Sequence, residues 1–237
     1  MAKVALCSAG VQNVFASGSS GGNMKIIAVE TWLTEVPFDM GAKPAVFGGI
    51  AWQSLATLWV RVVTDAGLEG WGEGFGHACC PATRAVVDTQ LGPAIIGQDA
   101  RDILGLNRTF AQGLHLFGRN GPHVYALSAL DTALWDIAGK AAGLPLWRLL
   151  GATPVATRTA YASLLRFPDP IQLGEACERA VADGYRDIKL HEIEVPQVRA
   201  ARQAIGPEPR LMVDVNCPWT VAQAIGMARA FREFDLA

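Results

Sequence analysis

Two short stretches decide the fold: Arg186-Asp187-Ile188-Lys189-Leu190-His191 and, about two dozen residues later, Leu211-Met212-Val213-Asp214-Val215-Asn216. Each is an apolar run of strand length that ends in polar side chains. A segment of helical length separates them, so the pattern predicts a β-α-β unit with parallel strands. The carboxyl ends of such strands meet at one edge, where α/β barrels carry their chemistry. We therefore expect Lys189, His191 and Asp214 to gather there for acid/base work beside a metal.

The same alternation continues on both sides of these stretches. Segments of strand composition alternate with helical segments, at residues 157–164, 170–183, 186–191, 195–205, 210–216 and 220–234. Three repeats at similar spacing are typical of an α/β barrel or of a doubly wound sheet. The sequence ends at Phe234-Asp235-Leu236-Ala237, which has the pattern of another strand beginning. We therefore expect most of such a barrel to be absent.

The first half of the chain has a different pattern. β-branched and aromatic residues at 26–33 and 54–63 predict strands. Asp65-Ala66-Gly67 predicts a turn from which residues 68–73 pair back as a hairpin. Residues 37–52, rich in glycine and proline, predict a long loop, and loops of that length are usually functional.

Helices are expected to follow this sheet. One runs from Pro81 towards Leu91, where Gly92-Pro93 is expected to interrupt it. The clearest spans residues 124–142, because its apolar residues recur at steps of three and four. Gly143 caps that helix at its C-terminus and Pro145 prevents its continuation.

The composition indicates a folded chain without obvious affinity for polyanions. Of the 237 residues, 51% are hydrophobic and 18% are charged, which is ample for a buried core. The net charge of −2 gives no reason to expect a nucleic acid or an anionic membrane as partner. No apolar run approaches the roughly 18 residues that span a bilayer. The five cysteines are irregularly spaced, which favours free thiols in a cytoplasmic protein.

The start of the chain does not resemble the rest. Ser17-Gly18-Ser19-Ser20-Gly21-Gly22 has the composition of a flexible linker. We therefore interpret residues 1–23 as a disordered extension and Met24 as the beginning of the fold.

From Met24 onwards the sequence resembles the mandelate racemase and muconate lactonizing enzyme branch of the enolase superfamily. The stretches that carry the resemblance are Gly70–Glu73, Ser128–Lys140, Gly143–Gly151, and Lys189–His191 taken together with Asp214–Asn216. The helix with its Gly-Leu-Pro exit is the most specific of them. The resemblance implies an α+β capping domain over residues 24–151. It also implies the first three βα units of a modified (β/α)₈ TIM barrel over residues 152–237.

The resemblance also implies roles for the residues at the strand ends. Such enzymes abstract a proton alpha to a carboxylate, and Mg²⁺ stabilises the resulting enediolate. Asp214 corresponds to the first of three carboxylate ligands of Mg²⁺, a cation that prefers oxygen ligands. Lys189 matches the first lysine of the family's Lys-X-Lys motif. Asn216 matches a position near the substrate.

His191 departs from the family pattern, because it stands where the second lysine usually appears. Imidazole can serve as a base with little tuning, since its ordinary pKa is about 6.5. An alternative is that His191 only orients the substrate or forms a hydrogen bond with Glu192. Both readings remain open at this point.

The implied function is that of a Mg²⁺-dependent lyase or isomerase acting on a small carboxylate or sugar acid. Dehydration of an acid sugar is the first expectation, and racemisation or epimerisation of a hydroxy acid is the second; a cycloisomerase is disfavoured by the missing second lysine. A full-length relative is expected to form a homo-oligomer. With one of the expected metal ligands present, this chain is expected to be an inactive fragment. A Schiff-base aldolase with Lys189 as nucleophile and a non-catalytic remnant are the alternatives from other classes.

Overall fold

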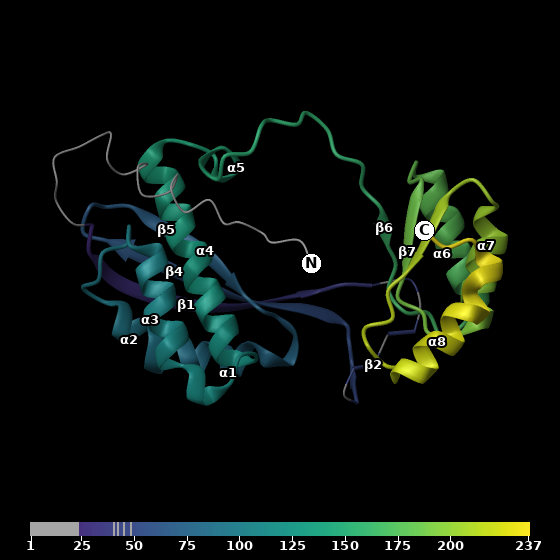
Figure 1. Cartoon of the computed structure of the whole chain (residues 1–237), viewed down its shortest axis with the longest axis horizontal. Coiled ribbons are helices and arrows are strands. Elements are labelled where there is room, and N and C mark those ends of the chain that lie inside the picture. Colours follow the sequence, from purple (N-terminus) through teal and green to yellow (C-terminus); the bar gives the residue numbers. More distant parts are fainter. Residues whose placement is uncertain (1–23, 40, 42, 45, 48) are drawn as a thin grey trace. The chain divides into compact units, whose positions relative to one another are not determined.

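The computed structural model describes residues 24–39, 41, 43, 44, 46, 47 and 49–237 (Figure 1). The predicted extension at residues 1–23 lies outside this range. The described chain forms two compact units. The first comprises the residues up to Val36 together with Ser54–Val155, and the second comprises Pro37–Gln53 together with Ala156–Ala237.

A three-stranded sheet in the order β1-β4-β5 forms the base of the first unit. Its strands are β1 (Ile26–Pro37), β4 (Ser54–Thr64) and β5 (Glu69–Gly74). β4 and β5 pair in antiparallel fashion, which confirms the predicted hairpin. Gly67 in the connecting turn has a φ of 76°, a conformation that glycine adopts without steric cost.

Helices cover this sheet. They are α1 (Cys80–Val86), α2 (Gly92–Ile95), α3 (Ile103–Gly113), α4 (Pro122–Ala142) and α5 (Leu146–Leu149), with 3₁₀ turns at His77–Cys79 and His115–Phe117. The predicted interruption at Gly92-Pro93 is wrong, because a π-helical turn at Val87–Leu91 carries the chain from α1 directly into α2. Pro93 lies in the first turn of α2, where a helix tolerates proline.

The close contact between β5 and α4 explains the glycines of the Gly-Trp-Gly-Glu stretch. A Cβ on Gly70 would lie 2.0 Å from the carbonyl oxygen of Ala133, and a Cβ on Gly72 would lie 1.9 Å from that of Ala129. No change of side-chain rotamer relieves such a clash, because the obstructing atoms belong to the helix backbone. The two glycines therefore allow α4 to lie directly on the strand (Figure 1).

The predicted cap of the long helix is confirmed, and so is the predicted apolar stripe except at its last residue, Ala141, which is exposed. α4 buries one face, whose residues are Ala126, Ala129, Leu130, Ala133, Leu134, Ile137, Ala138 and Gly139. Gly143 ends the helix in the left-handed conformation with a φ of 63°, and its N–H group donates to the Lys140 carbonyl. The helix is thus fixed between the sheet on one side and a defined exit on the other.

The segment between β1 and β4 is not the plain loop that its composition predicts. β2 (Val46–Phe47) and β3 (Ile50–Ala51) pair there in antiparallel fashion. This small hairpin belongs to the second unit.

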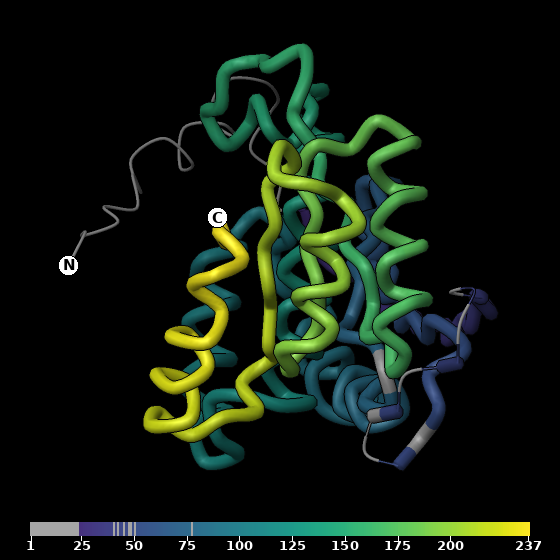
Figure 2. The backbone as a smooth tube through the Cα atoms, turned by 90° about the vertical axis from the view of Figure 1, so that its right-hand side faces the viewer, coloured from purple at the N-terminus to yellow at the C-terminus, as the bar shows by residue number. Residues whose placement is uncertain are grey.

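Strands and helices alternate in the rest of the second unit. In chain order they are β6 (Ala162–Ser163), α6 (Pro170–Ala182), β7 (Asp187–Leu190), α7 (Val195–Ile205), β8 (Arg210–Val213) and α8 (Val221–Ala230), followed by a 3₁₀ turn at Phe231–Phe234. The strands are parallel in the order β6-β7-β8. Figure 2 shows α6 and α7 side by side in front of them. An antiparallel capping sheet followed by parallel βα units, as in part of a barrel, is the predicted fold class.

The two edges of this parallel sheet are formed by short pairings. β6 is much shorter than the predicted strand at residues 157–164, because its register sets Ala162 opposite Ile188 and the residues before it extend past the start of β7. At the other edge, Leu236 forms a parallel bridge with Leu211.

None of the helices in the described part of the chain is long and apolar enough to cross a membrane.

Candidate active site

The alternation of side chains along β7 and β8 sorts the sheet into an apolar and a charged face. Ile188, Leu190 and Leu211 are fully buried in the core of the second unit. The intervening residues point to the opposite face, because successive side chains of a strand alternate. The register pairs Lys189 with Met212 and continues to Asp214, whose N–H donates to the Leu190 carbonyl at 2.8 Å. Lys189 and Asp214 are therefore on one face at the carboxyl ends of adjacent strands.

A short ion pair joins these two residues. Lys189 Nζ lies 2.8 Å from Asp214 Oδ2. This hydrogen bond holds the pKa of the Asp214 carboxyl below its ordinary value and raises the pKa of Lys189. Lys189 Nζ also lies 5.8 Å from the centre of the Tyr161 ring, which favours the ammonium form. The ion pair thus fixes the Lys189 ammonium group beside the Asp214 carboxylate at the edge of the sheet.

His191 lies beside this pair, and one of its ring nitrogens is hydrogen-bonded to the main chain. Its Nδ1 is 2.6 Å from the Leu164 carbonyl oxygen. A carbonyl oxygen only accepts, so Nδ1 carries the proton and Nε2 of the neutral ring carries the lone pair. Nε2 lies 3.9 Å from Asp214 Oδ2. One alternative from the sequence was a hydrogen bond between His191 and Glu192. The hydrogen bond of the His191 ring is instead with the main-chain carbonyl of Leu164.

Asn216 contacts the site through its main chain. Its N–H group donates to Asp214 Oδ1 at 3.0 Å. Asn216 and Cys217 both have positive φ angles, of 50° and 58°, so the chain turns sharply just after the carboxylate. The side chain of Asn216 is exposed, and its predicted contact with substrate stays a prediction.

Asp214 is the candidate ligand for Mg²⁺ among the residues of this cluster. Asp214 offers the oxygen chemistry that Mg²⁺ prefers. Its Oδ2 accepts from Lys189 and its Oδ1 accepts from the Asn216 N–H group. Among the described residues, no group of three or more His, Cys, Asp or Glu side chains is arranged to hold a metal ion. The described residues therefore do not fit a magnesium site by themselves.

Three further residues lie around the cluster: Tyr161 and Arg166, which the sequence analysis did not name, and Glu192, which it named only as a possible partner of His191. Tyr161 lies beside Lys189, Arg166 Nε donates to the His191 carbonyl at 2.9 Å, and Glu192 Oε1 accepts from the Phe167 N–H group at 2.7 Å. Glu192 is only 2% exposed. The sequence held a signal for it, because Glu192 continues the apolar face of β7, where an unpaired charge is rare.

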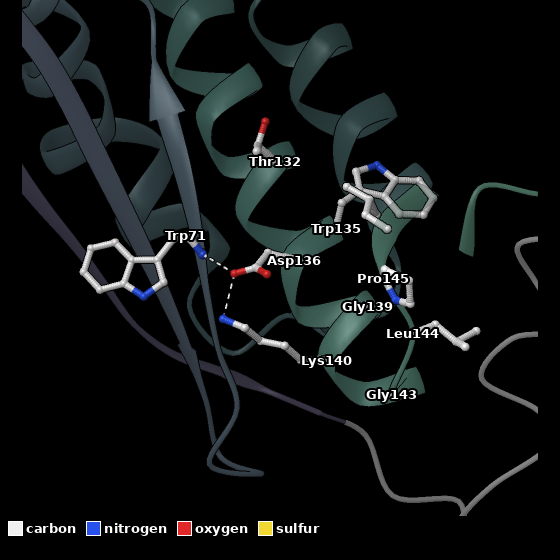
Figure 3. Close-up of a pocket in the computed structure, with 10 residues that line it drawn as sticks. Trp71, Thr132, Trp135, Asp136, Gly139, Lys140, Gly143, Leu144 and Pro145 are labelled. Atoms are coloured by element: carbon white, nitrogen blue, oxygen red, sulfur yellow. Dashed lines mark hydrogen bonds and ion pairs between the residues drawn. The ribbon is translucent and has the colours of Figure 1, made fainter. Parts of the chain in front are cut away.

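The first unit contains a separate hollow, of about 470 Å³, beside α4 (Figure 3). Asp136 Oδ2 accepts from the main-chain N–H group of Trp71 at 2.9 Å and from Lys140 Nζ at 2.8 Å. Lys140 Nζ also donates to the Glu69 carbonyl at 2.8 Å. The ionised groups of this hollow thus tie β5 to α4, which supports a structural role for them.

Comparison with known proteins agrees with this architecture. Residues 25–151 match the model of the mandelate racemase / muconate lactonizing enzyme N-terminal domain, and residues 172–237 match that of the enolase C-terminal domain-like family. The crystal structure of a racemase from Streptomyces coelicolor with bound magnesium superposes with a TM-score of 0.78. It is 32% identical, and the match covers 89% of this chain and 60% of that one.

Curated relatives point the same way. The 3,6-anhydro-alpha-L-galactonate cycloisomerase of Streptomyces coelicolor is 34% identical over 88% of this chain and 59% of its own length. The arabinonate dehydratase of Saccharolobus solfataricus is 27% identical over 79% of this chain and 52% of its own length. The chain therefore spans between half and three-fifths of the length of these relatives. On the match of its capping domain and the fold of both units, the chain belongs to the mandelate racemase and muconate lactonizing enzyme family of the enolase superfamily.

Proposed function

We propose that Lys189, His191 and Asp214 form one side of a site that removes a proton alpha to the carboxylate of an acid sugar. The observation that carries the proposal is their meeting at the carboxyl ends of β7 and β8, with Lys189 2.8 Å and His191 3.9 Å from Asp214. This edge of parallel strands is where α/β barrels act on substrates. The activity is proposed for the whole protein of which these residues are a part.

His191 and Lys189 take complementary roles in the proposed step. The lone pair on His191 Nε2 forms a bond to the alpha proton, and the electrons of the broken C–H bond move onto the substrate carboxylate to give an enediolate. The ammonium group of Lys189 stabilises this second negative charge as it develops. In dehydration, the enediolate then expels the β-hydroxyl group, which takes up a proton and leaves as water. The resulting enol becomes a 2-keto acid.

Dehydration is the first candidate outcome, and isomerisation is the second. An acid-sugar dehydratase among the relatives supports the first. The cycloisomerase and the racemase among the similar proteins favour isomerisation as the alternative, in spite of the missing second lysine. All of these outcomes can begin with the same abstraction of the alpha proton, so they share the roles assigned to His191 and Lys189.

The Schiff-base alternative finds no support at Lys189. An amine acts as a nucleophile only when it is neutral, and nucleophilic lysines have lowered pKa values. Here the hydrogen bond with Asp214 raises the pKa of Lys189. The ion pair therefore favours an electrostatic role for the lysine.

We further propose that Asp214 is one ligand of a Mg²⁺ site whose other carboxylates are not among the described residues. Mg²⁺ at such a site supplies positive charge next to the substrate carboxylate. One carboxylate, already paired with Lys189, holds Mg²⁺ poorly. The 237-residue protein by itself is accordingly expected to show no Mg²⁺ binding by calorimetry in the micromolar range and no turnover of acid sugars.

The proposed reaction is tested by fusing the chain to the part of the Streptomyces coelicolor cycloisomerase that follows the matched region. Exchange of the alpha proton for deuterium, followed by NMR in D₂O on a panel of acid sugars, measures the step directly. His191→Asn is expected to lower exchange by about 100-fold or more, within the usual contribution of a general base. His123→Asn, in the capping domain, is the matched control. Exchange that survives His191→Asn would overturn the role of His191, and turnover by the unfused chain would overturn the argument from its single carboxylate.

A further inference from the structure

Two loops at the edge of the parallel sheet are joined by hydrogen bonds around His191. One is the chain after β6, Leu164–Phe167, and the other is the chain after β7, His191–Glu192. The Leu164 N–H group donates to the Lys189 carbonyl at 2.9 Å, continuing the pairing of β6 with β7. The Leu164 carbonyl then accepts from His191 Nδ1 at 2.6 Å. The position of a single main-chain carbonyl thus decides which nitrogen of His191 carries the proton.

Two side chains hold these loops together in reciprocal fashion. Arg166, on the first loop, donates from Nε to the His191 carbonyl on the second at 2.9 Å. Glu192, on the second loop, accepts from the Phe167 N–H group on the first at 2.7 Å. Each side chain therefore bonds the other loop's backbone, and together they bracket the bond between His191 and Leu164. We call this pair of contacts the Arg166–Glu192 clamp.

We infer that the Arg166–Glu192 clamp is a positioning device that keeps His191 in the tautomer with its lone pair on Nε2, the nitrogen that lies 3.9 Å from Asp214 Oδ2. The inference rests on the proposed function for its catalytic meaning, since a base is useful only if its lone pair faces the substrate. The tautomer itself is a property of the folded chain.

The burial of Glu192 supports a specific role for its carboxylate. It is only 2% exposed, and a charge so deeply buried is costly unless it is hydrogen-bonded. Burial raises the pKa of Glu192, and the Phe167 N–H group and the nearby Arg166 charge offset that effect in part. An apolar residue would fill the same space without this cost but would leave the Phe167 N–H group without its acceptor. The buried Glu192 carboxylate is thus needed as the acceptor that holds the loop after β6 at Phe167.

The experiment measures the tautomer of His191 directly in the 237-residue protein. Long-range ¹H–¹⁵N correlation spectra of the histidine rings are recorded above the ordinary range of histidine pKa values, and His191→Gln identifies the signals of His191. The original protein is expected to show Nδ1 protonated and Nε2 unprotonated. Glu192→Ala and Arg166→Ala are each expected to lose this pattern, so that signals of the Nε2-protonated ring appear. Glu192→Gln, which keeps an acceptor oxygen for Phe167, is expected to retain it.

Arg202→Ala is the matched control. Arg202 also donates to main-chain carbonyls in the second unit, at Phe234 and Pro209, but does not contact the loops around His191. A general loss of stability would affect this variant as well, whereas loss of the tautomer is expected only in the clamp variants. Arg166 is partly exposed, so its variant keeps the test valid even if Glu192→Ala fails to fold.

The inference is overturned if the original protein has the proton on Nε2. It is also overturned if every folded variant among Glu192→Ala and Arg166→Ala keeps the original tautomer. Failure of the proposed function gives a different result: the tautomer depends on the clamp as expected, while alpha-proton exchange in the fused protein does not depend on His191. The two measurements therefore fail separately.

Discussion

At the scale of single residues, Asp99 gives the clearest dependence of stability on pH. Its carboxylate accepts from Arg101 Nη2 at 2.7 Å and from Arg101 Nε at 3.0 Å, and this bond holds the pKa of Asp99 below its ordinary value. A lowered folded-state pKa means that the contribution is complete above the unfolded value of about 3.9 and is lost as pH falls through the folded value. Asp99→Asn is expected to lower the free energy of unfolding at neutral pH by roughly 1 kcal/mol.

Urea denaturation followed by tryptophan fluorescence at several pH values checks this expectation. The difference between the original protein and Asp99→Asn should shrink as the pH is lowered from about 5 towards 3. Asp88→Asn, which removes an exposed i,i+4 pair with Arg84, is the control and should cost less. A difference that stays constant over this range would contradict the assignment of the contribution to the Asp99 carboxylate.

The residues of the candidate site were predictable to different degrees. Lys189 and Asp214 end strands of a β-α-β unit, and the parallel register alone brings such ends together, so their proximity follows from the sequence pattern. The bond between His191 and Leu164 could not be predicted, because it depends on where the backbone of another loop lies. The alternation along β7 sets Glu192 on the buried face, but its partner could not be predicted, since that partner is a main-chain N–H group that no side-chain pattern reveals.

At the scale of elements, the packing of β5 on α4 predicts a strong effect of a single methyl group. Gly72→Ala would set a Cβ 1.9 Å from the Ala129 carbonyl oxygen, so the helix or the strand must move. Such overpacking against backbone is expected to destabilise the first unit by roughly 3 kcal/mol or more. Thermal unfolding followed by circular dichroism measures the effect.

Gly113→Ala is the control for this substitution. Gly113 ends α3, no atom outside its own stretch of helix lies within 4 Å of the Cβ that alanine would add, and its φ is not positive. Alanine there is expected to be neutral or to stabilise by up to about 1 kcal/mol, because it lowers the entropy of the unfolded chain. Equal effects of the two substitutions would show that the close contact between β5 and α4 is not what requires glycine at position 72.

The elements were predicted best where one local signal dominates. The apolar stripe of α4 and the glycine at its end both depend on residues of the helix itself, and both are confirmed. Errors arose where a distant partner or an unusual turn decides the outcome. β6 is short because of its register against β7, and the π-helical turn at Val87–Leu91 carries the chain past Gly92-Pro93. Neither effect has a signature in the local sequence.

At the scale of the whole molecule, the two units have separate hydrophobic cores. Every buried residue of one core belongs to the first unit, and every buried residue of the other belongs to the second. The chain that leads from α5 to β6, residues 151–161, is exposed and contains no helix or strand. Units with their own cores are expected to fold and unfold largely independently, and exposed irregular chain between them is the preferred site of proteolysis.

Limited trypsin digestion tests this division of the molecule. Arg158 is the only lysine or arginine between residues 151 and 161, so cleavage of the folded protein within Met24–Ala237 is expected first after Arg158. The N-terminal product should keep the cooperative thermal transition of the first unit, because the core beneath α4 lies wholly within it. Arg158→Gln should slow the first cleavage without changing that transition. The contrary result is early cleavage within α4 or α6, together with simultaneous loss of the thermal transitions of both units. It would mean that the two units do not fold independently and that the second unit needs the first to stay folded.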